Sequence, residues 1–121
     1  MPRNFTVHDA PQGSSEWLAA RLGRVTASRM KDVLATIKSG EAAARRDYRT
    51  QLVCERLTGQ PQDDVFVSAD MQRGTDLEPV ARAAYEAQTG QWVEQVGFLA
   101  HTSLMAGGSP DGVVGDYDGL I

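Results

Sequence analysis

The sequence predicts a single α+β domain in which helices come first and a mixed sheet follows. Helical segments are expected between residues 16 and 89, and the two longest are followed by Gly59 and Gly90, which suit the left-handed position after a helix. Residues 92–101 then alternate between apolar and polar side chains, as a half-buried strand does. With 121 residues, 41% of them hydrophobic, the chain can form one modest core.

The first helix is expected over residues 16–22. Ser14 or Ser15 can accept a hydrogen bond from the free backbone N–H groups of the first turn, so either residue can be the N-cap. Gly23 ends the segment. The apolar contacts of this helix are expected from Trp17, Leu18 and Leu22.

A second helix is expected over residues 27–36, with Thr26 or Ser28 as its N-cap. The spacing of its apolar residues predicts a face turned toward the core, made by Met30, Val33, Leu34 and Ile37. Residues 38–41, KSGE, have the composition of a loop.

The third helix is expected over residues 42–58. Its Arg45, Arg49 and Arg56 lie within about 40° of one another at 3.6 residues per turn, so they form a basic ridge. Ordinary solvated arginines explain such a ridge more often than a nucleic-acid interface does. Both explanations stay open at this point.

The fourth helix is expected to begin at Met71 or Asp76 and to end at Thr89. Pro79 either lies in the first turn, where its missing N–H costs nothing, or kinks a longer helix. The residues expected to be buried are Val80, Ala81, Ala84 and Tyr85.

Three strands are expected, in residues 92–101, in residues 104–106 and from Val113 onward. The dipeptide Asp118-Gly119 predicts a tight hairpin turn. Only two residues follow this turn, so the returning strand has no partner ladder. We therefore expect the chain to be a fragment, truncated within the sheet before the domain is complete.

Charge is divided unevenly along the chain, whose formal net charge is −4. Residues 1–60 hold ten Lys or Arg against six Asp or Glu, a balance of +4. Residues 61–121 hold two against ten, a balance of −8. A basic half and an acidic half suit a protein in which one part binds phosphates and another binds divalent cations. Folding can also bring the basic and acidic residues together, so that no separate charged regions result.

The composition argues against several classes of protein. No apolar run approaches the roughly 18 residues of a membrane span, and the N-terminus lacks the apolar region of a signal peptide. Cys54 is the single cysteine, which excludes a disulfide framework and a cysteine-rich zinc site. A cytoplasmic protein is the expectation.

Two carboxylates are candidate metal ligands. Asp111 follows a proline and precedes a glycine, so its carboxylate is held on a rigid turn, as a metal ligand requires, although the same tripeptide is a common turn. Glu78 lies near the expected start of the fourth helix, where the dipole favours any carboxylate. It can also pair with Arg82 four residues later.

A candidate phosphate site lies between the first two helices. A helix beginning near residue 27 has free N–H groups, and Thr26 and Ser28 place hydroxyls beside them. Arg21 on the preceding helix adds a cation, which completes a cradle suited to phosphate. Capping alone also explains the two hydroxyls.

Three segments occur in the order QGSSEWLAARLGRVTASRM, RGTDLEPVARAAYEAQTG and GGSPDGVVGDYDGLI. Together they resemble the YqaJ-type viral recombinase family of lambda-exonuclease-like nucleases, over residues 12–121. The resemblance implies a restriction-endonuclease-like core of the PD-(D/E)xK superfamily.

The resemblance also implies an activity. Members are deoxyribonucleases that degrade linear double-stranded DNA from 5′ ends, in the 5′ to 3′ direction, for recombination. Mg²⁺ is the implied cofactor, with Mn²⁺ as a substitute. The implied partners are double-stranded DNA ends, a single-strand annealing protein and two further copies of the chain in a homotrimer. No membrane partner is expected. The expected location is the cytoplasm of a bacterial or phage-infected host cell.

Carried over by position, the resemblance implies that Asp111 and Glu78 are catalytic residues that bind the metal. It implies that Arg21, Ser28 and Ser109 bind the 5′-terminal phosphate. The family's Glu-x-Lys is expected directly after residue 121. We therefore expect this chain to hold half of an active site and to have little activity alone, whereas the intact parent is an enzyme.

Two other hypotheses remain. In the first hypothesis, the chain is complete and acts as a non-catalytic DNA-end or protein-binding module derived from this fold. In the second it is a small acidic adaptor, which the isoelectric point of about 5.0 permits.

Overall fold

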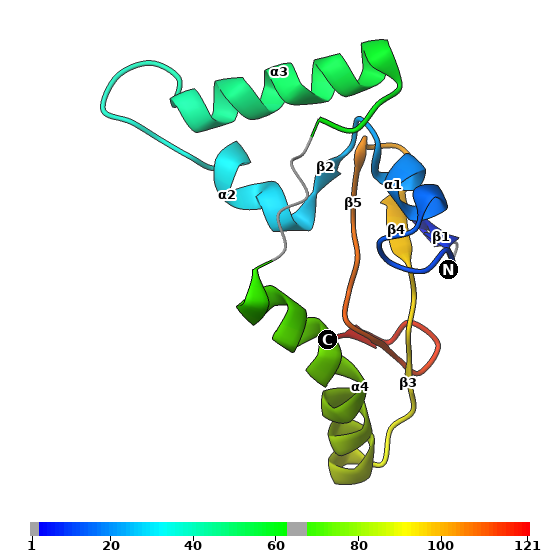
Figure 1. The fold of residues 1–121 in the computed structure, drawn as a ribbon. Helices are drawn as coiled ribbons and strands as arrows, with labels where there is room; N and C mark the ends of the chain where they lie inside the picture. Colours follow the sequence, from blue (N-terminus) through cyan, green and yellow to red (C-terminus); the bar gives the residue numbers. More distant parts are fainter. Residues whose placement is uncertain (1–2, 63–67) are drawn as a thin grey trace. The chain divides into compact units, whose positions relative to one another are not determined.

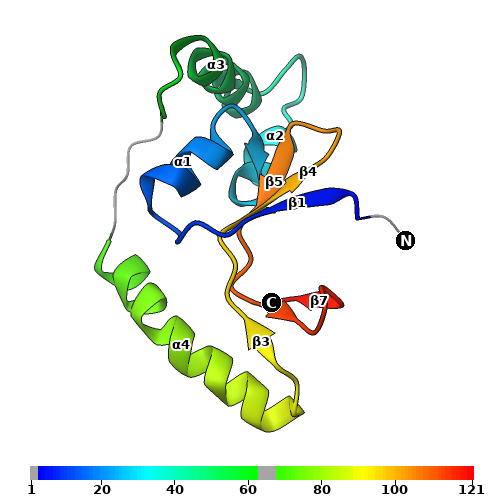
Figure 2. The ribbon, with the colours of Figure 1, turned by 90° about the vertical axis from the view of Figure 1, so that its right-hand side faces the viewer.

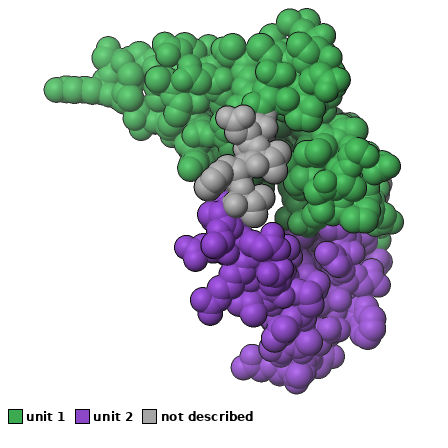
Figure 3. Space-filling view, in the orientation of Figure 1, with its two compact units in different colours: residues 1–62, 97–109 green, residues 63–96, 110–121 purple. Residues whose placement is uncertain are grey.

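The computed structural model describes residues 3–62 and 68–121. The chain forms two compact units, which Figure 3 shows in different colours: unit 1 takes residues 1–62 and 97–109, and unit 2 takes residues 63–96 and 110–121. Each unit has its own sheet and at least one helix of its own. The single domain expected from the sequence stays a prediction.

The sheet of unit 1 has four strands in the order β1-β4-β5-β2 (Figures 1 and 2). Their bounds are β1 Phe5–His8, β2 Val25–Thr26, β4 Phe98–His101 and β5 Ala106–Gly108. Strands β2 and β5 run parallel, whereas β4 is antiparallel to both β1 and β5. The sheet is therefore mixed, and the α+β fold class is confirmed. Strand β1 was not predicted from the sequence.

The helices of unit 1 are α1 Ser15–Arg21, α2 Met30–Val33 and α3 Ala43–Thr58, with a 3-10 turn, η1, at Ala27–Arg29. Ser14 is the N-cap of α1, because its hydroxyl accepts the N–H of Trp17 at 3.2 Å. Gly59 ends α3 with φ +68°, the left-handed conformation that favours glycine. The predictions for α1 and α3 are confirmed.

The helix predicted over residues 27–36 is wrong in extent. Its first residues form a 3-10 turn, only four residues are α-helical, and no side chain caps either piece. Thr36 pairs with Glu41 in an isolated β-bridge, which turns the chain back and ends the helix early. Leu34 and Ile37 are 68% and 56% exposed, so the predicted core face does not form.

Phe98 is the centre of the core of unit 1, and its side chain is fully buried. The neighbouring strand carries Gly107, where an added Cβ would lie 2.4 Å from Phe98 Cζ. The ring therefore packs directly over a bare backbone. Tyr48 and Ala100 are also buried in this unit.

Unit 2 contains one long helix, α4 Ala69–Thr89, and a sheet with the order β3-β6-β7. The strands are β3 Val93–Glu94, β6 Val113–Val114 and β7 Gly119–Leu120, all antiparallel. Ser68 is the N-cap of α4, Gly90 follows its last turn, and Pro79 lies inside it. Of the two alternatives for Pro79, the longer helix is the one observed.

The face of α4 that is turned inward is polar. No residue of this fully described helix is buried, and Val80 is 65% exposed. Its half-buried positions are Glu78, Arg82, Tyr85 and Glu86. Glu86 accepts the backbone N–H of Val93 at 3.3 Å, which ties the helix to β3. The prediction that Val80, Ala81 and Ala84 are buried is therefore wrong.

The strands differ from the prediction in their limits. Residues 92–101 form two strands in two different sheets, and the strand expected at residues 104–106 lies at 106–108. The C-terminal hairpin is confirmed, but its turn comes earlier, because Asp118 N–H donates to Val114 O at 3.0 Å. Among the described helices, none combines the length and apolar character that a membrane span needs.

Candidate functional site

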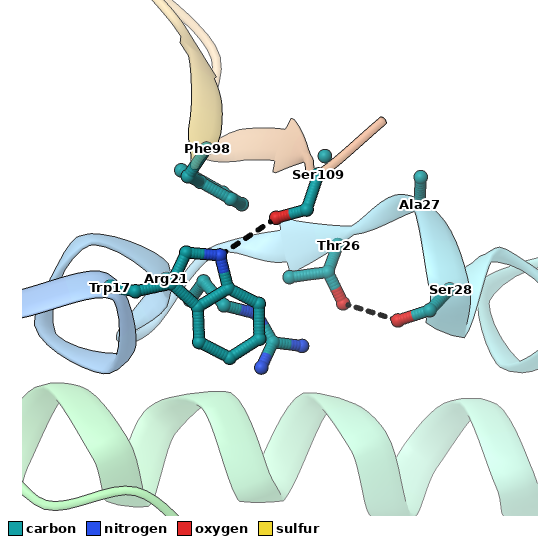
Figure 4. A pocket seen from close by; sticks show the side chains of 8 residues that line it. Trp17, Arg21, Thr26, Ala27, Ser28, Phe98 and Ser109 are labelled. Atoms are coloured by element: carbon teal, nitrogen blue, oxygen red, sulfur yellow. Dashed lines mark hydrogen bonds between the residues drawn. The ribbon is translucent and has the colours of Figure 1, made fainter. Parts of the chain in front are cut away.

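A cavity of about 220 Å³ in unit 1 collects side chains from three parts of the chain (Figure 4). Helix α1, the β2–η1 segment and the β4–β5 segment all contribute to its wall. The sequence-predicted residues Arg21, Ser28 and Ser109 all line it. The complete lining is Trp17, Arg21, Thr26, Ala27, Ser28, Phe98, Gly108 and Ser109.

The cation of this pocket is held by an aromatic ring. Arg21 lies one helical turn after Trp17 on α1, and its guanidinium carbon is 4.2 Å from the centroid of the indole ring. The face of the guanidinium is therefore occupied by a cation–π contact. Within residues 3–62 and 68–121, no carboxylate lies at ion-pair distance from Arg21, so its N–H groups are left for an anion.

The Trp17 ring also makes a polar contact that joins helix α1 to the segments around β4 and β5. Its Nε1–H points to Ser109 Oγ at 2.9 Å and to the carbonyl oxygen of Gly97 at 3.1 Å. The sequence predicts only an apolar contact for Trp17, so these hydrogen bonds are an addition. The indole N–H was the available signal, because it usually finds a partner when the ring is buried.

Two hydroxyls stand on the β2–η1 side. Thr26 Oγ1 and Ser28 Oγ lie 3.3 Å apart (Figure 4). The backbone N–H of Thr26 donates to the hydroxyl of Tyr48 at 3.1 Å, and both residues are buried. Because residues 27–29 form a short 3-10 turn, the predicted α-helix N-terminus is not part of this site. Hydroxyls and one guanidinium are its polar groups instead.

Small residues allow the two sides of the pocket to approach. An added Cβ at Gly108 would lie 3.3 Å from the Cβ of Ala27, a close contact. Ser109 follows directly on the same segment. A larger side chain at position 108 would therefore push Ser109 away from η1.

The basic ridge of α3 is bonded within unit 1. Arg49 makes a two-pronged contact with Glu41, with Nη2 2.9 Å from Oε2, and Arg45 is 3.6 Å from the same carboxylate. The hydrogen bond from Arg49 lowers the pKa of Glu41. Arg56 donates to the carbonyl oxygen of Gly23 at 3.0 Å. These contacts favour a structural role for the ridge.

The two predicted metal ligands lie in unit 2 and share a neighbour, Arg82. Its Nη1 is 3.7 Å from Glu78 Oε2 and 3.3 Å from the backbone carbonyl oxygen of Asp111. The i,i+4 ion pair expected as the structural alternative for Glu78 is thus present. Arg82 joins the helix that carries Glu78 to the turn that carries Asp111.

The turn around Asp111 is fixed by its backbone. The N–H groups of Asp111 and Gly112 donate to the carbonyl oxygen of Ile121 at 2.8 and 3.1 Å. The Asp111 carboxylate is exposed. In the described part of the chain no three His, Cys, Asp or Glu side chains form a group that could hold a metal ion. The metal-binding and catalytic roles of Asp111 and Glu78 stay predictions, as do the phosphate-binding roles of Arg21, Ser28 and Ser109.

Known proteins resemble this chain closely. The family model of the YqaJ-like viral recombinase domain matches residues 16–120. The structure of LHK-Exo in complex with dAMP is similar with a TM-score of 0.71 and 49% identity, over 85% of this chain and 49% of that one. The alkaline exonuclease LHK-Exo from Laribacter hongkongensis gives a TM-score of 0.70 and 48% identity, over 88% and 50%. The chain thus spans about half the length of these structures. A search of curated proteins found no match.

Proposed function

We propose that this chain, which belongs to the YqaJ-like viral recombinase domain family, is part of a phage-type exonuclease. The exonuclease would degrade linear double-stranded DNA from 5′ ends for recombination. The solved relatives at 48–49% identity are exonucleases, which supports the nuclease role. The observation that carries the proposal is the pocket in which Arg21, Ser28 and Ser109 meet. Its proposed ligand is the 5′-terminal phosphate.

The chemistry of the pocket suits a terminal phosphate. A guanidinium offers planar N–H pairs that match two phosphate oxygens. A serine hydroxyl has one proton to donate, and Ser28 keeps its proton for the phosphate when Thr26 is the donor of their shared hydrogen bond. No carboxylate among the described residues competes for Arg21. A 5′-hydroxyl end lacks the dianionic phosphate, so it leaves the guanidinium without its partner.

The proposed metal ligands are Asp111 and Glu78. The Asp111 carboxylate is exposed and the Glu78 side chain is 31% exposed, so both are open to a hydrated cation. Carboxylate oxygens are the ligands that Mg²⁺ and Mn²⁺ prefer. A bound divalent cation would polarise the scissile phosphate and lower the pKa of a water molecule. In this chain, Arg82 would hold the Asp111 turn beside α4 and partly balance the charge of Glu78.

Family membership supports the remaining parts of the proposal. They are a 5′ to 3′ direction, a homotrimeric assembly, a single-strand annealing protein as partner and a cytoplasmic site of action. Two carboxylates alone do not complete a catalytic metal site, so we expect the 121-residue chain by itself to cleave DNA slowly or not at all.

A second candidate function is a non-catalytic module that binds DNA ends. The ion pair between Glu78 and Arg82 favours it, because a carboxylate proposed as a metal ligand is here paired with a protein cation. This module would keep the preference for a 5′-phosphate and would not cleave with any divalent metal.

The proposal is tested with hairpin DNA that presents one blunt end, either 5′-phosphorylated or 5′-hydroxyl. We expect tighter binding of the phosphorylated end, and we expect Arg21→Ala to remove the preference. Arg46→Ala is the matched control, since Arg46 lies on α3 with a 60% exposed side chain beside Asp47. Equal affinity for both ends would overturn the phosphate site.

The metal is tested with Mn²⁺ followed by electron paramagnetic resonance. We expect Asp111→Asn to weaken Mn²⁺ binding, whereas Asp116→Asn, on the exposed hairpin turn, should leave it unchanged. Binding that is the same in both variants would place the metal elsewhere. The cleavage test uses the longest form of the protein that can be expressed, with Mg²⁺ added. If this protein prefers 5′-phosphorylated ends but does not cleave the DNA, the result favours the non-catalytic module.

A further inference from the structure

The pocket described above contains one aromatic side chain with two separate polar tasks. Trp17 supports the guanidinium of Arg21 with its ring face and reaches Ser109 with its edge. We propose that Trp17 is a positioning residue that sets the selectivity of this pocket for a 5′-phosphate. This inference rests on the proposed function and adds a residue to its phosphate site.

The first task follows from the hydrogen-bonding capacity of the groups. Indole nitrogen can only donate, whereas a serine hydroxyl has one proton and two acceptor lone pairs. At 2.9 Å, Ser109 Oγ must therefore be the acceptor of the Trp17 N–H. The Ser109 proton is then directed away from Trp17, and it is available to an acceptor such as a phosphate oxygen.

The same N–H also fixes the backbone. Gly97 O lies 3.1 Å from Nε1, so one donor is shared between the start of the β4 segment and the residue that follows β5. These two acceptors are 80 and 92 residues from Trp17 in the sequence. Trp17 thus sets the position of Ser109 relative to α1, the helix that also carries Arg21.

The second task concerns Arg21. An arginine without an ion pair samples many rotamers, and binding must then immobilise it. The cation–π contact at 4.2 Å holds the guanidinium over the indole face and leaves its N–H edges free. The face of the Trp17 ring positions the Arg21 guanidinium, and its edge positions the Ser109 hydroxyl, so that both groups can bind the same phosphate.

The two tasks are separated by substitution. Trp17→Phe keeps an aromatic face for Arg21 and removes the indole N–H. Trp17→Leu removes both. The matched control is Trp92→Phe in unit 2, because Trp92 is the other tryptophan of the chain and is 70% exposed. Thermal unfolding of each variant checks that it folds.

The measurement is the ratio of the Kd values for the 5′-hydroxyl and 5′-phosphorylated hairpin ends. We expect Trp17→Phe to lower this ratio by about tenfold, the size of one hydrogen bond to a charged group, with the affinity for the hydroxyl end unchanged. Trp17→Leu should lower it further, and Trp92→Phe should retain it. A packing role alone would weaken both ends equally and leave the ratio as it is, which overturns the inference.

A double-mutant cycle with Ser109→Ala shows whether Trp17 acts through Ser109. Because the two side chains share one hydrogen bond, their effects on the ratio should be less than additive. Full additivity would overturn this part of the inference.

A second readout does not need a Trp17 variant to fold. Trp92→Phe leaves Trp17 as the single tryptophan, and its fluorescence should change with the phosphorylated end but not with the hydroxyl end. An unchanged emission at saturation overturns the inference while the proposed function stands. If the wild-type chain itself does not distinguish the two ends, the proposed function fails first.

Discussion

Arg82 donates its Nη1–H to the backbone carbonyl oxygen of Asp111 at 3.3 Å, across 29 residues of sequence. The Arg82 side chain is 15% exposed, whereas Asp111 lies at the surface. Its other neighbour, Glu78, lies one turn earlier on α4. A residue of the helix thereby holds the turn that presents a predicted metal ligand.

Arg82→Ala is expected to lower the free energy of unfolding by about 1 kcal/mol, because the Asp111 carbonyl loses a charged donor. Arg73→Ala is the matched control, since Arg73 is exposed on the same helix. It should change stability by less than about 0.5 kcal/mol. Urea unfolding followed by circular dichroism measures both. Equal values for the two variants would mean that the Arg82 contact does not stabilise the chain.

Tyr48→Phe is expected to cost about 1–3 kcal/mol of stability, because it leaves the buried N–H of Thr26 without its acceptor. The phenyl ring retains the stacking surface on which Arg29 lies, at 4.3 Å from the ring centroid. The loss therefore reports the hydroxyl. Tyr85→Phe is the control, since in the described part of the chain the hydroxyl of half-buried Tyr85 has no hydrogen bond. A similar small effect for both would contradict the role of the Tyr48–Thr26 bond.

Gly107→Ala and Gly74→Ala should change stability in opposite directions. At Gly107 the new Cβ would lie 2.4 Å from Phe98 Cζ and 2.5 Å from the Leu99 carbonyl oxygen, so the strand must shift. We expect a loss of about 1–3 kcal/mol. At Gly74, inside α4, the new Cβ would meet no atom of the described residues within 4 Å beyond its chain neighbours and the nearby backbone of the helix itself, and alanine should stabilise the helix by about 0.5–1 kcal/mol. Thermal unfolding measures both, and a stabilising Gly107→Ala would contradict the packing of Phe98.

The ion pair of Glu41 should weaken in acid. The hydrogen bond from Arg49 lowers the pKa of Glu41 below its ordinary value of 4.5. The pair therefore stabilises the folded chain above that value, and the stabilisation is lost as the pH falls through the lowered pKa. Because the pair is solvent-exposed, its effect on stability should be small.

Carboxyl NMR titration of Glu41 measures this shift directly. In Arg49→Gln the pKa should return toward 4.5, whereas Arg46→Gln, which removes only a weaker charge effect, should move it little. A Glu41 pKa that is the same in the wild type and in Arg49→Gln would refute the assignment.

Predictions from the sequence succeeded where a structure depends on neighbouring residues. Ser14 caps α1, and Gly59 and Gly90 follow α3 and α4 in left-handed conformation, because capping involves groups within one helical turn. The C-terminal hairpin follows the same logic. The second helix failed, because the Thr36–Glu41 bridge and the pairing of β2 with β5 decide its limits. The β2–β5 pairing joins residues about 80 apart and is not visible in a local pattern, and the apolar spacing of residues 27–37 did not reveal the short-range Thr36–Glu41 bridge.

The candidate site divides in the same way. The residue types of Arg21, Ser28 and Ser109, and their family motifs, were recognisable in the sequence. Their meeting in one cavity depends on the pairing of β2 with β5, which joins segments far apart in the chain. The second task of Trp17 was missed because its acceptors are distant in sequence.

The sequence by itself determined the family, the α+β class, the ends of the long helices and the chemical groups available for phosphate and metal. Tertiary structure alone decided which groups meet: the edge of Trp17 with Ser109, Arg82 with the Asp111 turn, and the polar rather than apolar face of α4 turned inward. The physical reason is the distance in sequence between the groups that interact. Caps and turns are satisfied by groups a few residues away, whereas a hydrogen bond across the fold exists only after the chain has packed.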